Sequence, residues 1–437
     1  MSNRDEKVAI FWFRRDLRLN DNVGLFHALN CGLKVVPIFI FDKLILDKLS
    51  NRNDARVTFI RNQIERLNNE LKPLQSSLKT YFNTPQDAFK DVLISYNVQH
   101  VFTNSDYEPY ALKRDAEISN YLSESGITFH TFKDQVIFEK NDILKADKKP
   151  YTIFTPYKNQ WKLKLKEFDY QTYNTTNLFI NFKQLEFKQP HTLEEIGFVK
   201  SELNFPSSIP NDELIRNYEA IRNFPNKNTS KMGLHLRFGT ISIRQLIQKA
   251  LNLSEVWLNE LIWRDFFMMI LYHFPYSATN SFKPAYDKIE WRNNEHHFEC
   301  WCNGKTGYPL VDAGMRQLNA TGFMHNRVRM VTASFLCKNL LIDWRWGESY
   351  FAEKLLDYDL SANVGNWQWA SGSGCDAAPY FRVFNPSLQA EKFDKQEEYI
   401  NKWIPEYGTS EYPEAIVDAK ASAKKAIDVY KKALNSF

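Results

Sequence analysis

The sequence predicts an α/β domain with a doubly wound parallel sheet, followed by an all-helical domain. In residues 1–132, short apolar runs alternate with amphipathic segments of helical length, which is the pattern of parallel strands joined by helical crossovers. Beyond residue 210, nearly every segment has helical periodicity instead. We therefore expect domains at 1–132 and 211–437, joined by a Pro-punctuated, Asn- and Lys-rich connector at 133–210.

The elements of the first domain follow one another along the chain. Residues 8–13 and 34–41 are apolar runs of the length of a buried strand, and 54–71 carries apolar residues along one helical face. Further strands are expected at 78–82, 100–103 and 127–132, and further helices at 85–96 and 111–122. The turn after the first strand reads RRDLR and has no G-x-G-x-x-G, which excludes a standard dinucleotide-binding domain.

The composition of the 437-residue chain is that of a globular protein. With 43% hydrophobic residues and no apolar run near the roughly 20 residues of a membrane span, it predicts neither disorder nor a membrane segment. The N-terminus lacks a secretory signal, so we expect a cytosolic protein. The net charge of +4 is too small to indicate a partner. Five scattered cysteines predict neither a disulfide framework nor a metal site, because no second pair completes Cys300 and Cys302.

A basic segment follows the expected connector. Residues 222–254 contain six Lys and Arg side chains and no acid, and Thr229, Ser230 and Lys231 lie within this segment. Hydroxyls and a lysine at the start of a helix suit phosphate oxygens, since free N–H groups and the helix dipole add positive potential. An ordinary helix cap with a solvated basic face remains the alternative.

The next segment places a carboxylate and an indole on one helical face. Glu260 and Trp263 are three residues apart, an arrangement that suits hydrogen bonding and stacking with a planar ligand. A plain ion pair between Glu260 and Arg264 is the competing interpretation.

Two later segments favour a ligand. Asn326 and Met330 lie one helical turn apart, and residues 357–369 combine carboxylates, amides and two indoles, with Asn363 and Trp367 on one face. Buried amides need hydrogen-bond partners, and a heteroaromatic ligand would supply them.

These motifs, taken in order, carry a family resemblance. The chain resembles the DNA photolyases of the cryptochrome/photolyase family, most closely the microbial (class I) type that repairs cyclobutane pyrimidine dimers. The resemblance rests on residues 12–18, 257–266 and 304–309 and is densest over 324–386. It implies an FAD, bent into a U, in the helical domain, with FADH⁻ as the active form. Blue light would drive an electron to a flipped-out dimer in UV-damaged DNA, and a monomer would suffice.

The resemblance also implies the site residues. The expected FAD contacts are Tyr218, Thr229, Ser230 and Lys231 near the phosphates, and Arg264, Asn326, Asp357, Asp359 and Asn363 around the pocket, with Asn363 opposite flavin N5. The expected dimer contacts are Glu260, Trp263, Met330 and Trp369, with Asn326 also near the substrate. The expected contacts to flanking phosphates are Arg222, Arg327 and Arg382. The expected electron relay is Trp367, Trp344 and Trp291, from the flavin to the surface. Other indoles, among them Trp257, Trp301 and Trp346, are assigned to packing.

Two departures from the family pattern affect the expected cofactors. Met232 and Gly233 stand where a second serine usually follows the phosphate-binding lysine, so one hydroxyl contact is either missing or replaced by a backbone N–H. Ala111 stands where members with a folate antenna have a glutamate, which disfavours folate. A deazaflavin, a second flavin such as FMN, or an empty antenna site remains open.

Three alternatives to dimer repair agree less well with the sequence. A cryptochrome-type photoreceptor with FAD would usually carry an extended C-terminal tail, whereas residues 413–437 are expected to form one amphipathic helix. A 6-4 photoproduct photolyase would have more histidines near Asn326–Met330 than His325 alone. A generic flavin redox enzyme would need a nicotinamide-binding motif, and the sequence has none. Repair of cyclobutane dimers is therefore the expected function.

Overall fold

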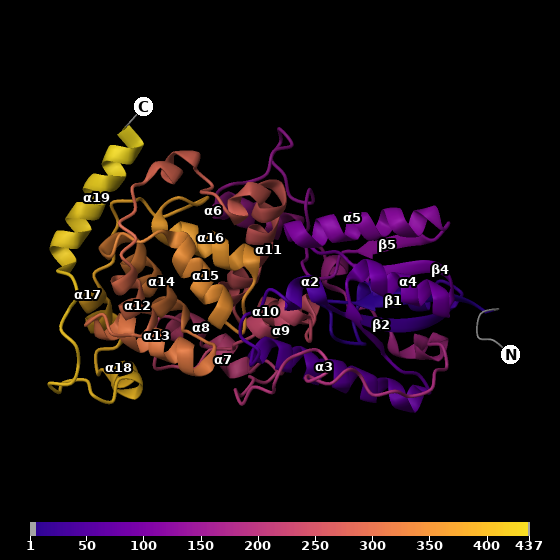
Figure 1. Ribbon diagram of the computed structural model, residues 1–437. Coiled ribbons are helices and arrows are strands. Elements are labelled where there is room, and N and C mark those ends of the chain that lie inside the picture. Colours follow the sequence, from indigo (N-terminus) through magenta and orange to yellow (C-terminus); the bar gives the residue numbers. More distant parts are fainter. Residues whose placement is uncertain (1–5, 436–437) are drawn as a thin grey trace. The chain divides into compact units, whose positions relative to one another are not determined.

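The computed structural model describes residues 6–435, and the chain divides into two compact units (Figure 1). The α/β unit comprises Met1–Glu139, Leu165–Ser208 and Met232–Lys249, and the helical unit comprises Lys140–Lys164, Ile209–Lys231 and Ala250–Phe437. The expected fold class, α/β and then helical, is confirmed.

A five-stranded parallel sheet forms the centre of the α/β unit. Its strands are β1 (Lys7–Phe13), β2 (Lys34–Asp42), β3 (Lys79–Asn83), β4 (Asn97–Asn104) and β5 (Thr128–Phe132), in the spatial order β3-β2-β1-β4-β5. All four neighbouring pairs are parallel, because each crossover passes over a face of the sheet. The strand order therefore reverses at β1, which lies between β2 and β4.

Helices cover both faces of this sheet. They are α1 (Val23–Leu29), α2 (Lys43–Leu46), α3 (Ala55–Leu71), α4 (Pro85–Ser95) and α5 (Pro109–Glu124). On one face, Trp12 of β1 packs edge-to-face against Phe89 of α4 at 5.2 Å between ring centroids. On the other face, Gly24 of α1 lies so close to β1 that a Cβ there would come within 3.0 Å of the Phe11 ring. The alternation of side chains along β1 thus builds two cores, one on each face.

Two arginines and two aspartates form a buried ionic cluster in the α/β unit. Arg18, in the turn after β1, binds Asp134 at 2.7 Å, and Arg244 binds Asp134 and Asp21, each at 2.8 Å. Burial raises the pKa of Asp134, but the charges and hydrogen bonds of the two guanidinium groups outweigh it and bring the pKa to about 2. The cluster fixes the helix α10 (Ile243–Leu253) to the turns that follow β1 and β5.

The expected connector is not a single linking segment. Residues 140–164 belong to the helical unit and include the helix α6 (Phe154–Lys164), while 165–208 belong to the α/β unit. Residues 232–249, expected in the helical domain, also belong to the α/β unit. Hydrogen bonds explain the second difference, because Leu17 donates its backbone N–H to the Phe238 carbonyl at 3.0 Å and the Arg18 guanidinium donates to the Gly239 carbonyl at 2.9 Å.

The helical unit is built mainly from helices that follow residue 208. They are α7 (Asp212–Arg216), α8 (Tyr218–Ile221), α11 (Glu255–His273), α12 (Glu295–Cys302), α13 (Pro309–Thr321), α14 (Asn326–Ser334), α15 (Trp344–Lys354), α16 (Leu360–Ser371), α17 (Pro386–Phe393), α18 (Glu398–Trp403) and α19 (Ala419–Asn435). A π-helical turn, η6 (Phe335–Asn339), follows α14, and the short helix α9 (Gly233–Phe238) belongs to the α/β unit. One core cluster joins α12 to α16 and contains the buried indoles Trp301, Trp344 and Trp367. Over residues 6–435, no helix is both long and apolar enough to cross a membrane.

Candidate functional site

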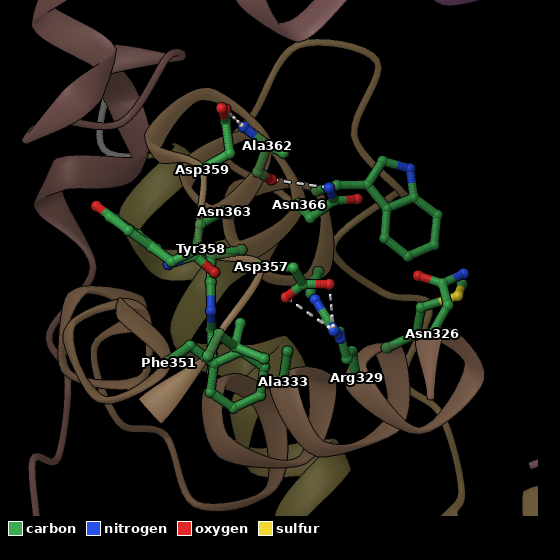
Figure 2. A pocket seen from close by; sticks show the side chains of 15 residues that line it. Asn326, Arg329, Ala333, Phe351, Asp357, Tyr358, Asp359, Ala362, Asn363 and Asn366 are labelled. Atoms are coloured by element: carbon green, nitrogen blue, oxygen red, sulfur yellow. Dashed lines mark hydrogen bonds and ion pairs between the residues drawn. The ribbon is translucent and has the colours of Figure 1, made fainter. Parts of the chain in front are cut away.

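A pocket in the helical unit brings together residues from two distant motifs (Figure 2). It holds about 600 Å³ of atom-free space, part of it open to solvent, and is lined by α14, α15, α16 and the loop before α16. Seven of the expected site residues line it: Asn326, Met330, Asp357, Asp359, Asn363, Trp367 and Trp369. The lining mixes carboxylates and amides with aromatic rings, as a pocket for a polar heteroaromatic ligand requires.

Asp357 is held by an arginine that the sequence interpretation missed. Arg329 donates from Nη2 to both carboxylate oxygens of Asp357, at 3.0 and 3.1 Å, and from Nε to the Met324 carbonyl at 2.7 Å. Figure 2 shows this ion pair on the pocket wall. Arg329 follows Asn326 by one helical turn, and that spacing is the signal by which it could have been found.

Asp359 is the N-cap of α16. Its Oδ1 accepts hydrogen bonds from the Ser361 hydroxyl at 2.5 Å and from the Ala362 N–H at 3.3 Å, while its carbonyl accepts the Asn363 N–H at 2.8 Å. An aspartate in this position satisfies free N–H groups of the first turn and so fixes where the helix begins. The cap therefore positions Asn363, four residues further along.

The orientation of Asn363 is set by a second missed residue, Glu348 of α15. The Asn363 amide nitrogen donates to the Glu348 carbonyl at 3.1 Å and to its Oε1 at 2.9 Å. Both contacts use the nitrogen, so the amide oxygen points away from Glu348. Burial raises the pKa of Glu348, and the Asn363 hydrogen bond opposes that shift. Glu348 had no signal in the sequence, where it is one acid among many on a helix.

Glu260 forms a second cluster with Arg222 and Tyr218. The Arg222 guanidinium binds Glu260 at 2.7 Å and lies 5.2 Å from the centroid of the Tyr218 ring, and the Tyr218 hydroxyl hydrogen-bonds Glu260. Burial raises the pKa of the Glu260 carboxyl, while Arg222 and Tyr218 lower it. The sequence predicts that Glu260 contacts the dimer, Arg222 a DNA phosphate and Tyr218 the FAD. In the structure, all three residues contact one another at the Glu260 carboxyl.

Trp263 lies one turn after Glu260 on α11, is half-buried, and packs against two phenylalanine rings. Its ring stacks on Phe154 of α6 with 3.6 Å between centroids and a 7° interplanar angle, and it also contacts Phe267 at 5.3 Å. Phe154 was missed because it lies within the expected connector. A rigidly backed indole is a stacking platform for a planar ring.

The remaining expected residues of the helical unit differ in their side-chain contacts and exposure. Arg327 donates to the Asn223 Oδ1 at 2.5 Å and lies over the Phe393 ring at 4.4 Å, whereas Arg382 is exposed on the loop before α17. Arg264 is half-buried on α11.

Thr229, Ser230 and Lys231 lie in the loop before α9 rather than in a helix, and Lys231 has a φ of 51°. A left-handed conformation at a non-glycine residue is uncommon and often marks a binding site.

The three expected relay indoles belong to one core cluster. Trp367 lines the pocket and is 2% exposed, Trp344 is 1% exposed, and Trp291, the expected surface end of the relay, is half-buried. The Trp367 ring rests on Gly347 of α15, where a Cβ would come within 2.1 Å of a ring carbon. Trp301, expected to serve packing, also contacts the Trp367 ring at 6.1 Å.

Comparison with known proteins identifies the family. Residues 9–175 match the family model described as DNA photolyase, and residues 257–411 match the model described as the FAD binding domain of DNA photolyase. The deoxyribodipyrimidine photo-lyase of Escherichia coli (strain K12) is 34% identical over 479 residues, covering 97% of this chain and 98% of that relative. This chain belongs to the DNA photolyase family. The resemblance inferred from the motifs is thereby confirmed.

Solved structures of photolyases have the same fold. A bacterial class III photolyase from Agrobacterium tumefaciens superimposes with a TM-score of 0.87 at 29% identity, over 98% of each chain. An archaeal photolyase from Sulfolobus tokodaii, solved with two FAD molecules, superimposes with a TM-score of 0.81 at 33% identity and covers 97% of this chain and 99% of its own. The pocket of this photolyase-family chain lies within the segment that matches the FAD-binding domain.

Proposed function

We propose that this chain is a deoxyribodipyrimidine photo-lyase that uses blue light to split cyclobutane pyrimidine dimers in DNA. One observation carries the proposal: seven residues whose roles the photolyase resemblance implies line a single pocket inside the matched FAD-binding segment. The set includes residues from both ends of the 326–369 region, which only the fold brings together.

The donors that line the pocket fit FAD. Asn363 is locked by Glu348, and Asp357 is neutralised by Arg329, so both side chains hold fixed orientations towards a ligand. Asp359 is fixed by its capping contacts at the start of α16. Reduced FAD, when bound, would supply on excitation the electron that opens the dimer. Asn363 would present its amide oxygen to the flavin without placing a full negative charge there.

The second cluster would hold the lesion. Glu260, in the protonated form that burial favours, would donate a hydrogen bond to a base carbonyl of the dimer, where negative charge develops. Trp263 would stack on the dimer, supported by Phe154. Arg222 and Tyr218 would keep the Glu260 carboxyl in place. Met330 and Trp369, both on the pocket wall, would complete the contacts to the dimer.

The test is direct. Reduced enzyme is incubated with an oligonucleotide that contains one thymine dimer, in the dark and under blue light, and the dimer is quantified. Loss of the dimer in light alone is the expected result. An enzyme that holds reduced flavin and leaves the dimer intact in light would contradict the proposal, and repair of a 6-4 photoproduct instead would reassign the substrate.

The partner, the antenna and the location are finer parts of this proposal. We propose that the enzyme acts as a monomer on UV-damaged DNA with no obligatory protein partner, which light scattering of the repairing enzyme tests. Extraction and spectroscopy of the bound chromophores would distinguish a deazaflavin, a second flavin and an empty antenna site. Fractionation of the native cells tests the expected cytosolic location.

A further inference from the structure

A π-helical turn in the helical unit directs two polar side chains into the protein interior. The turn η6 (Phe335–Asn339) extends α14 and contains Lys338, which is 1% exposed, and Asn339, which is 5% exposed. A π turn adds a residue to the helical repeat and is frequently found at functional sites. An interior ammonium group is costly unless a partner holds it.

The partner of Lys338 is a backbone carbonyl in the loop before α17. Its Nζ donates to the Arg382 carbonyl at 2.7 Å. Burial is the main reason that the pKa of Lys338 is lowered, to about 8, and the positive charge of Arg382 lowers it further. The environment therefore opposes this charge, and an unbranched apolar side chain would fill the same space without that cost. The hydrogen bond of the ammonium connects η6 to the loop before α17.

The loop that Lys338 holds has a folded inner side and an exposed outer side. Arg382 closes a turn by donating its N–H to the Pro379 carbonyl at 2.9 Å, and Tyr380 stacks on Tyr430 of α19 at 6.0 Å with a 13° interplanar angle. The outer side presents Phe381, which is 61% exposed, and the exposed guanidinium of Arg382. We call residues 379–382 the tip turn.

The same π turn also binds α19, the helix whose Tyr430 stacks on Tyr380 of the tip turn. Asn339 donates from Nδ2 to the Ala419 carbonyl at 3.2 Å and to the Ser422 hydroxyl at 3.0 Å, both in the first turn of α19. Since α19 carries Tyr430, adjacent residues of η6 fix the tip turn directly and through this helix.

We propose that Lys338 is a positioning residue that fixes the tip turn so that Arg382 meets a DNA phosphate and Phe381 meets the bases beside the lesion. The inference rests on the proposed function and deepens it. A guanidinium on a fixed turn contributes a phosphate contact and an apolar ring contributes contact with unstacked bases, whereas a mobile turn must first be ordered on binding.

The test compares Lys338→Met, Arg382→Ala and the double variant in the full-length, FAD-loaded protein. Binding to a duplex with one thymine dimer is measured in the dark over a series of salt concentrations. Each single variant is expected to bind about tenfold more weakly, as for the loss of one charged hydrogen bond. Each should also reduce the steepness of the salt dependence by about 0.9, the value of one phosphate contact. The double variant should show no further loss of salt dependence beyond Arg382→Ala, and it should bind more weakly than Arg382→Ala by less than the full effect of Lys338→Met, because only the Phe381 contact is left to lose.

The controls separate positioning from stability. Lys395→Met, which removes an exposed lysine of the same unit, should keep the wild-type affinity and salt dependence. If Lys338→Met lowers the melting temperature but keeps the salt dependence, or if its effect adds fully to that of Arg382→Ala, the proposal is wrong. Should Lys338→Met not fold, Tyr380→Ala removes the other support and should reduce the salt dependence likewise; an unchanged salt dependence would overturn the proposal. Failure of the wild-type enzyme to repair dimers would instead refute the proposed function.

Discussion

Glu260 is the side chain on which recognition of the lesion depends in this proposal. Glu260→Ala should bind FAD normally but lose about 1.5–3 kcal/mol of interaction with the dimer, the value of a hydrogen bond to a charged group. Glu260→Gln keeps a hydrogen-bonding group and should lose less. Repair yield per absorbed photon, with FAD content measured by absorbance, checks this expectation. Equal repair by the alanine variant would remove the assigned role.

Glu348 should control both the stability of the pocket and the orientation of Asn363. Glu348→Leu removes the Oε1 acceptor of the Asn363 amide and keeps only the backbone carbonyl, which should lower the free energy of unfolding by about 1–3 kcal/mol and let the amide turn. Glu348→Gln preserves an acceptor oxygen and is the matched control. Thermal unfolding and the rate of reoxidation of the reduced enzyme in air are the measurements. Identical behaviour of the two variants would show that Glu348 does not orient Asn363.

At the scale of elements, α15 and α16 carry two of the three relay indoles. Trp344→Phe should block photoreduction of the oxidised cofactor, because phenylalanine is much harder to oxidise, and should leave repair by chemically reduced enzyme unchanged. Trp346→Phe, a half-buried indole on the same helix, is the control and should photoreduce normally. Transient absorption after a laser pulse measures the first step, and steady illumination measures the second. Loss of repair by pre-reduced Trp344→Phe would contradict the relay assignment.

The contact between α15 and α16 depends on Gly347. A Cβ there would lie 2.1 Å from the Trp367 ring and 2.5 Å from Leu336 Cδ2, so Gly347→Ala should destabilise the protein by about 1–3 kcal/mol, although alanine favours a helix. Ser349→Ala, at an exposed position of the same helix, should be neutral or slightly stabilising. Denaturant midpoints provide the comparison, and a midpoint of Gly347→Ala at or above the wild type would show that the ring moves aside at no cost.

Patterns local to one element were predictable from the sequence, and contacts between elements were not. Apolar periodicity placed the strands of the sheet and most helices, since periodicity reflects which face is buried. Asn326 and Asn363 could be predicted as site residues from their motifs. Glu348 and Phe154 could not, because the spacing of residues within one element does not indicate which residues of another element they contact. The π turn was equally invisible, since its sequence FLCKN resembles any buried helical end.

At the scale of the whole molecule, the buried ionic cluster should govern stability towards acid. The pKa of Asp134 is about 2 in the folded protein against 3.8 for a free carboxyl, so its contribution is present above pH 3.8 and is lost as the pH falls towards 2. Asp134→Asn leaves two buried guanidinium groups without that charge and should cost about 3–5 kcal/mol at neutral pH. The difference from wild type should shrink below pH 4. Asp147→Asn, in an exposed ion pair, should cost less than about 1 kcal/mol.

Urea unfolding at several pH values, followed by circular dichroism, measures these differences. A gap between Asp134→Asn and wild type that stays constant from pH 7 to pH 2 would show that folding does not lower the pKa of Asp134.

The interleaving of the two units affects the chain while it is being made. Asp134 leaves the ribosome 110 residues before Arg244, its second partner, because the α/β unit is completed only by residues 232–249. At about 5–20 residues per second, this corresponds to a delay of roughly 5–20 s. During that time the nascent sheet has one guanidinium for two carboxylates, and α10 has not yet been synthesised. The α/β unit is therefore complete only once residue 249 has been synthesised, and a nascent chain that stalls before residue 244 exposes an incomplete ionic core to chaperones and proteases.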